Sequence, residues 1–178
     1  MTQTVQSTRP ANGPKPARRR AREAVLQALY GWQIGSQDLA ACETALHEIE
    51  GFGQLRDAEQ KFAIALLRGC IANHESLREQ LTPLLDRPFV ELSPIEGCIL
   101  LLGAHEMGNS PETPLRVVLN ESIELAKTFG GTDGHKFVNG VLDRLAPTLR
   151  PLESSRPTRL DSYGRRVRTD RTPAAPDL

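Results

Sequence analysis

Cysteines and long apolar runs are both scarce in this sequence. The three cysteines, Cys42, Cys70 and Cys98, are odd in number and form no CxxC pair, so neither a disulfide framework nor a zinc site is expected. No stretch approaches the roughly 18 apolar residues of a membrane span, and residues 1–22 contain no apolar core of a signal sequence. We therefore expect a protein of the reducing cytoplasm that needs no metal, cofactor or membrane.

Motifs that carry catalysis are also missing. His105-Glu106 lacks the second histidine of a zinc-protease motif, and no phosphate-binding loop, GxSxG or dinucleotide fingerprint is present. A carboxylate pair of Glu106 with Glu121 or Glu124 could act as general acid and base, but an acid paired with a cation or a backbone donor is far more common. The sequence predicts a binding protein rather than an enzyme.

Charged residues are abundant and unevenly distributed. The 22 basic and 22 acidic residues cancel, yet residues 1–22 hold six cations and no acid, and seven arginines face four acids from Arg150 onward. Two basic ends beside an acidic centre suit a polyanionic partner, although solvated tails would look the same. Residues 1–16 and 151–178 have few large apolar residues, so we expect both to be disordered around one domain, 17–150.

Within that domain the apolar residues recur at helical spacing. The first helix, about 17–34, carries an apolar stripe centred on Val25 and Ala28. Ser93-Pro94-Ile95-Glu96 has the pattern of a capped helix start, and Asp57 with Gln60 resembles a capping box. The pattern predicts an all-α domain of about seven helices over these approximate ranges: 17–34, 37–50, 57–71, 76–85, 94–107, 115–129 and 134–146.

Two segments could bind a nucleic acid. Four arginines lie in the first turn of the first helix, and guanidinium groups match the geometry of phosphates. Cations at the start of a helix oppose its dipole, and an anionic ligand would account for this small cost. The segment GGTDGHKFVNGVLD at 130–143 places a lysine and a phenylalanine after a glycine-rich turn. A solvated arginine cluster and a plain helix-helix turn with Phe137 in the core are the alternatives.

One face of the first helix could bind a protein. On a helical wheel Tyr30 lies nearly opposite the apolar stripe, with Leu26 as a neighbour. A tyrosine is frequent at interfaces because it combines a large apolar body with a polar tip. The alternative is that a neighbouring helix covers this face.

Three segments together resemble the NusB family: RRRAREAVLQALYGWQ at 18–33, LNESIELAKTFG at 119–130 and GHKFVNGVLDRLAP at 134–147. The resemblance covers roughly 17–150. It implies seven helices in two subdomains, and binding of boxA RNA from ribosomal RNA leader transcripts together with the ribosomal protein NusE. It also implies assembly with RNA polymerase and other Nus factors in antitermination, and a possible homodimer.

The resemblance also assigns residues. It implies RNA contacts for seven residues: Arg18, Arg19, Arg20, Arg22, Asp133, Lys136 and Phe137, of which Asp133 could instead cap the seventh helix. It implies partner contacts for Tyr30 and Glu96, and we expect Leu26, the neighbour of Tyr30 on the helical wheel, to share them. We expect the arginines and Phe137 to form a single surface that holds an unpaired strand. Three alternatives stay open: an adaptor that binds protein only, a ribosome-assembly factor, and a methyltransferase fusion, which would need a Rossmann-type domain.

Overall fold

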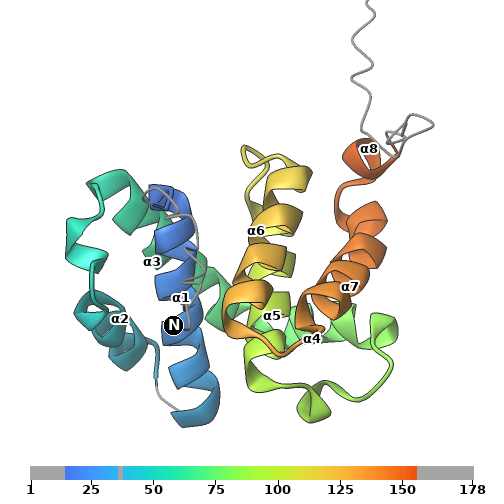
Figure 1. The fold of residues 1–178 in the computed structure, drawn as a ribbon, viewed down its shortest axis with the longest axis horizontal. Coiled ribbons are helices and arrows are strands. Elements are labelled where there is room, and N and C mark those ends of the chain that lie inside the picture. The colour runs from blue at the N-terminus through green and yellow to red at the C-terminus, as the bar shows by residue number, and fades with distance from the viewer. Residues whose placement is uncertain (1–14, 36–37, 156–178) are drawn as a thin grey trace, which may run out of the picture.

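The described part of the chain, residues 15–35 and 38–155 of a computed structural model, is built from helices (Figure 1). These residues contain no strand, which confirms the predicted all-α class. In chain order the α-helices are α1 (Ala17–Gly35), α2 (Leu39–Glu48), α3 (Asp57–Ala72), α4 (His74–Leu81), α5 (Pro94–Asn109), α6 (Leu115–Phe129), α7 (Gly134–Leu149) and α8 (Pro151–Ser154). Three single 3-10 turns lie between them: η1 (Phe52–Gln54), η2 (Thr82–Leu84) and η3 (Phe89–Glu91). None of the described helices has the length and apolar character needed to cross a membrane.

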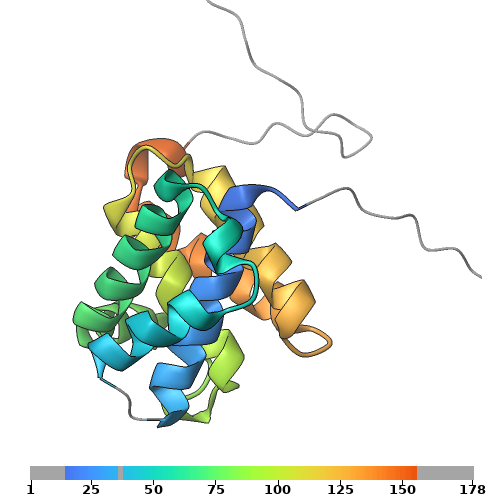
Figure 2. The same cartoon turned by 90° about the vertical axis from the view of Figure 1, so that its left-hand side faces the viewer.

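Helix α5 lies at the centre of the bundle. All of its residues from Gly97 to Met107 are buried, as expected for a helix that is apolar on every side. α1, α2 and α3 pack together on one side of α5, and α6 and α7 pack on the other (Figure 1). Seen from the side, α2 and α3 lie over α1 (Figure 2). The two groups share one continuous apolar core, and this arrangement matches the predicted bundle.

The helix directions give the bundle two distinct ends. α1 runs antiparallel to α5, because Arg22 near its start binds Glu106, and Gln33 near its end accepts a hydrogen bond from Cys98. α7 runs parallel to α5, because Gly134 at its first residue lies against Glu96. We call the end where α1 begins and α5 stops the α1-start end. The opposite end, where α7 begins, is the α7-start end (Figure 1).

Most predicted helix ranges agree with the structure to within a few residues, but the predicted caps differ. Ser93 is the N-cap of α5 as expected, yet its side chain makes no capping hydrogen bond. The N-cap of α3 is Arg56 and not Asp57. The side chain of Gln60 donates to the carbonyl of Leu55 at 2.8 Å, so no capping box forms. The helix positions therefore follow from apolar packing more than from side-chain caps.

The end of α7 differs from its prediction. Pro147 lies inside the helix instead of ending it, and α7 continues to Leu149. A proline in the last turn removes only one hydrogen bond, and the N–H of Arg150 still binds the carbonyl of Ala146 at 2.7 Å. α8 then occupies the first four residues of the range 151–178. The rest of both expected tails, 1–14 and 156–178, lies outside the described residues.

Candidate nucleic-acid interface

Arg22 is buried in the centre of the bundle. Its side chain is 4% exposed, and its Nε donates to Oε2 of Glu106 at 2.8 Å while Nη2 donates to Oε1 of the same carboxylate. Glu106 is itself 1% exposed, and a buried carboxylate needs such a partner. The expected RNA contact of Arg22 is therefore wrong, because this guanidinium cannot reach a phosphate. The carboxylate of Glu106 is occupied by this ion pair, so it does not form the general acid-base pair with Glu121 or Glu124 that the sequence left open.

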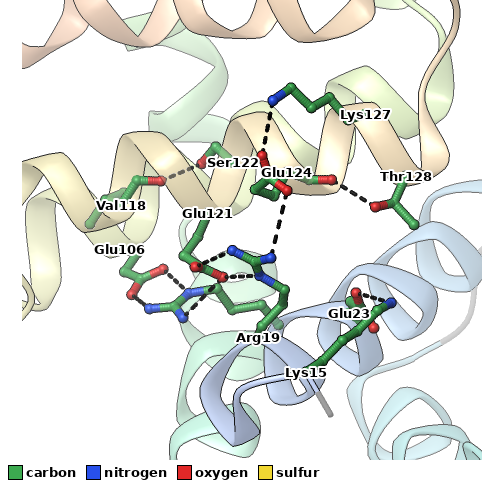
Figure 3. A network of polar contacts seen from close by, with 11 residues as sticks. Lys15, Arg19, Glu23, Glu106, Val118, Glu121, Ser122, Glu124, Lys127 and Thr128 are labelled. Atoms are coloured by element: carbon green, nitrogen blue, oxygen red, sulfur yellow. Dashed lines mark hydrogen bonds and ion pairs between the residues drawn. The ribbon is translucent and has the colours of Figure 1, made fainter. Parts of the chain in front are cut away.

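Arg19 lies between α1 and α6, where acids already surround it (Figure 3). Its Nε and Nη2 donate to the two carboxylate oxygens of Glu121 at 3.0 and 2.9 Å, and Nη1 lies 3.6 Å from Glu124. The hydrogen bond to Glu121 raises the pKa of Arg19. An RNA phosphate would have to compete with two carboxylates for this side chain.

Arg18 and Arg20 differ from their neighbours. Within residues 15–35 and 38–155 neither guanidinium forms an ion pair with an acid. Arg18 is exposed and lies 4.2 Å from the ring centroid of Phe62. The Nε of Arg20 is buried and has no hydrogen-bond partner in this part of the chain. Neither charge is balanced by an ion pair in this part of the chain, although Arg20 shares a groove with Glu23 and Glu50.

A second candidate site is a groove at the α7-start end. Asp133 and Phe137 line it together with Glu96, so two residues expected to contact RNA meet one expected to contact a protein. Phe137 packs against the core but is only half-buried. Its ring is therefore both a core residue and accessible to a base, so the two interpretations of this residue are compatible. Lys136 pairs with Asp133 at 2.8 Å, and both side chains are 72% exposed.

The expected protein-binding face of α1 is only partly accessible. Tyr30 is 37% exposed and lies toward the α7-start end, where Glu96 also lies. Leu26 is 1% exposed, so the prediction that it binds a partner is wrong. α2, α3 and α5 all pack against α1, and a helix with neighbours on three sides buries more than the single stripe seen on a helical wheel.

Arg18 and Phe137 lie at opposite ends of the bundle. Arg18 shares a groove with Asn109 near the last turn of α5, whereas Phe137 shares one with Glu96 near its first turn. About 20 Å of helix separates Glu96 from Asn109 at 1.5 Å per residue. A single surface that contains both would therefore have to extend along α5 from one end of the bundle to the other. The structure offers two sites, one at each end of the bundle.

Comparison with known proteins identifies the family. The family model described as the NusB family matches residues 19–147, which is most of the chain. The chain belongs to the NusB family. A protein of Dechloromonas aromatica named transcription antitermination protein NusB is 57% identical over 140 residues, covering 79% of this chain and 84% of that protein. The match is to a family of antitermination proteins and not to a family of enzymes, as the sequence predicts.

Solved structures of NusB proteins have the same fold. NusB of T. maritima superposes with a TM-score of 0.67 at 30% identity, covering 75% of this chain and 92% of that one. A chain in a crystal structure of the antitermination factors NusB and NusE in complex with dsRNA superposes with a TM-score of 0.66 at 20% identity, covering 74% of this chain and 97% of that one. The NusB-type arrangement of helices is thus confirmed.

One residue of the α7-start groove was missed by reasoning from sequence. Arg87 lines the groove, and its guanidinium lies 6.0 Å from the ring centroid of Phe137. Arg87 also pairs with its neighbour Asp86 at 3.0 Å. It lies between η2 and η3, where no helical periodicity indicates a face, and Phe137 is 50 residues further along the chain. No local signal could have found this contact.

Proposed function

We propose that this NusB-family chain binds boxA RNA of ribosomal RNA leader transcripts together with the ribosomal protein NusE. With RNA polymerase and other Nus factors, this complex supports processive transcription of rRNA operons. The family match over residues 19–147 carries the proposal. The curated relatives named as antitermination proteins support it, and so does the similar fold solved with NusE and RNA.

The contacts of the described side chains refine the assignment of residues. Arg18 and Arg20 bind RNA phosphates, because no acid occupies them in the described part of the chain. Phe137, with Lys136 and Asp133 beside it, contacts the strand at the α7-start end, where a half-exposed ring can stack on a base. Tyr30 and Glu96 contact NusE. Arg19 contributes only where a phosphate displaces Glu121.

A second candidate is an adaptor or ribosome-assembly factor that binds protein without reading an RNA sequence. The observation in its favour is that acids of the same chain occupy two of the four arginines, Arg19 and Arg22. Fewer cations remain for phosphates than the sequence predicts. The two functions differ in whether boxA RNA binds better than a scrambled strand.

The decisive measurement compares affinity for boxA RNA and for a scrambled RNA, with and without NusE, over a salt series. We expect the wild-type chain with NusE to prefer boxA. Replacing both free arginines, Arg18→Gln with Arg20→Gln, should weaken binding about tenfold or more and reduce the salt slope by about 1.4, since each single-strand phosphate contact contributes about 0.7.

The matched control removes two arginines that other contacts occupy. Arg68 pairs with Glu43 of α2, and Arg144 donates to the carbonyl of Leu84 at 2.6 Å. Arg68→Gln with Arg144→Gln removes the same charge and should leave the salt slope unchanged. Equal losses in the two double variants would contradict the phosphate contacts, and equal binding of boxA and scrambled RNA would favour the adaptor.

A further inference from the structure

A separate groove lies at the α1-start end, between α1, α3 and the last turn of α5. Its volume is about 400 Å³, and ligand pockets typically measure about 300–1,000 Å³. Its polar lining residues are Arg18, Lys61, His105, Asn109, Ser110 and Glu112. Neither Lys61 nor Phe62, which also lines it, belongs to the sites assigned above.

We propose that this groove holds one nucleotide of the bound RNA strand, with its phosphate on Arg18 and Lys61 and its base stacked beside Phe62. This inference rests on the proposed function, because the strand must already bind the start of α1. Arg18 belongs to both places: it is at the first turn of α1 and it also lines the groove. A strand held by Arg18 therefore has an adjacent place for its next nucleotide.

The charges of the groove fit a phosphate. Lys61 is exposed, and within the described residues it forms no ion pair. Arg18 is likewise unpaired with any acid there. Glu112 is the single acidic side chain in the lining, against these two cations. Two unpaired cations in one groove can donate charge-assisted hydrogen bonds to a phosphate. Arg19 and Arg22 cannot do so as readily, because they already donate such bonds to carboxylates.

The ring of Phe62 fits a base. The guanidinium of Arg18 lies 4.2 Å from the ring centroid, and the ring itself is only partly buried. Unpaired bases stack on aromatic rings and on the flat face of arginine, so the pair of side chains forms a platform for one base. The sequence has only five phenylalanines, and this one lies beside two unpaired cations.

The far wall of the groove can contact the edge of a base. The Nδ2 of Asn109 donates to the carbonyl of His105 at 3.0 Å, while its Oδ1 has no donor among the described residues. Burial lowers the pKa of His105 and so disfavours a charged ring beside Asn109. Asn109 therefore keeps an acceptor for an amino group of a base. A free mononucleotide has the same chemistry, and the test separates it from a strand.

The test uses the full chain with NusE and boxA RNAs that carry 2-aminopurine at one position each. A base stacked beside Phe62 should have quenched fluorescence at one position, and Phe62→Leu should restore it. We expect this variant to weaken RNA binding about tenfold, as loss of one stacking contact does, with the salt slope unchanged. Lys61→Gln should instead reduce the slope by about 0.7.

The control is Arg68→Gln, on the same helix two turns from Lys61 and paired with Glu43. Circular dichroism and thermal unfolding establish that each variant is folded, and Lys61→Gln does not touch the core. The groove proposal is overturned if wild type binds RNA but both variants bind like the control and no position responds to Phe62→Leu. AMP that binds wild type as tightly as the strand would also overturn it. A wild-type chain that binds no RNA overturns the proposed function itself.

Discussion

Arg18 and Arg22 are one helical turn apart on α1 and both lie over the ring of Phe62, at 4.2 and 5.1 Å from its centroid. Their environments nevertheless differ. Arg18 is in the first turn and is exposed, whereas Arg22 is one turn further along, is buried and binds Glu106. The sequence predicts the arginine cluster but cannot show which arginine is buried, because Glu106, the acid that binds Arg22, is 84 residues away along the chain. The burial of Leu26 was missed for the same reason.

The buried pair gives a prediction about stability. Arg22→Met leaves Glu106 without its partner in the core, and an unpaired buried charge typically costs about 3–5 kcal/mol of unfolding free energy. The double variant Arg22→Met with Glu106→Leu removes both charges and should recover most of that loss. Urea unfolding measures all three proteins. Arg18→Met, at an exposed position, should change stability by about 0.5 kcal/mol or less. A single Arg22→Met variant as stable as wild type would show that the pair is not needed.

Among the helices, the apolar pattern predicts where α1, α5 and α6 begin and end, because a helix forms between residues that are close together in the sequence. The end of α7 was not predictable in this way. Arg150, just after α7, donates to the carbonyls of Met107, Ser110 and Thr113 at 2.6, 2.8 and 3.3 Å. These carbonyls belong to the end of α5 and the α5–α6 loop, about 40 residues earlier. A proline therefore does not end α7, because tertiary contacts hold the segment that follows it.

Removing this arginine should loosen the loop. Arg150→Met removes the arginine's hydrogen bonds to three partly buried carbonyls, of which that of Ser110 keeps another donor, the N–H of Thr113 at 2.9 Å. We expect a loss of about 2 kcal/mol. The amide of Leu115, which donates to Glu153 of α8 at 2.8 Å, reports on the same region. Its hydrogen exchange should become faster in the variant. Arg144→Met is the control, because that side chain donates to a single carbonyl. Unchanged exchange at Leu115 would mean that α8 holds its place without Arg150.

At the scale of the whole molecule, the fold class follows from the sequence but the geometry of the site does not. The motifs at the starts of α1 and α7 look equivalent along the chain, since each opens a helix with cationic residues. Only tertiary packing makes α1 antiparallel and α7 parallel to α5, and this places the two motifs at opposite ends. An RNA that contacts both must therefore extend along the bundle.

RNA length should reveal this separation. On a boxA RNA long enough to reach both ends, Arg18→Gln and Phe137→Leu should each weaken binding, and their free-energy effects should add within about 0.5 kcal/mol, as for groups more than about 7–10 Å apart. On an RNA too short to span α5, only one of the two variants should weaken binding, because the strand reaches only one end. Affinities of both single variants and the double variant on both RNAs decide the matter. Strong coupling between the two substitutions, or a short RNA whose binding is weakened equally by both, would mean that the two ends of the bundle come together when RNA binds. The antiparallel packing of α1 on α5 opposes such a movement.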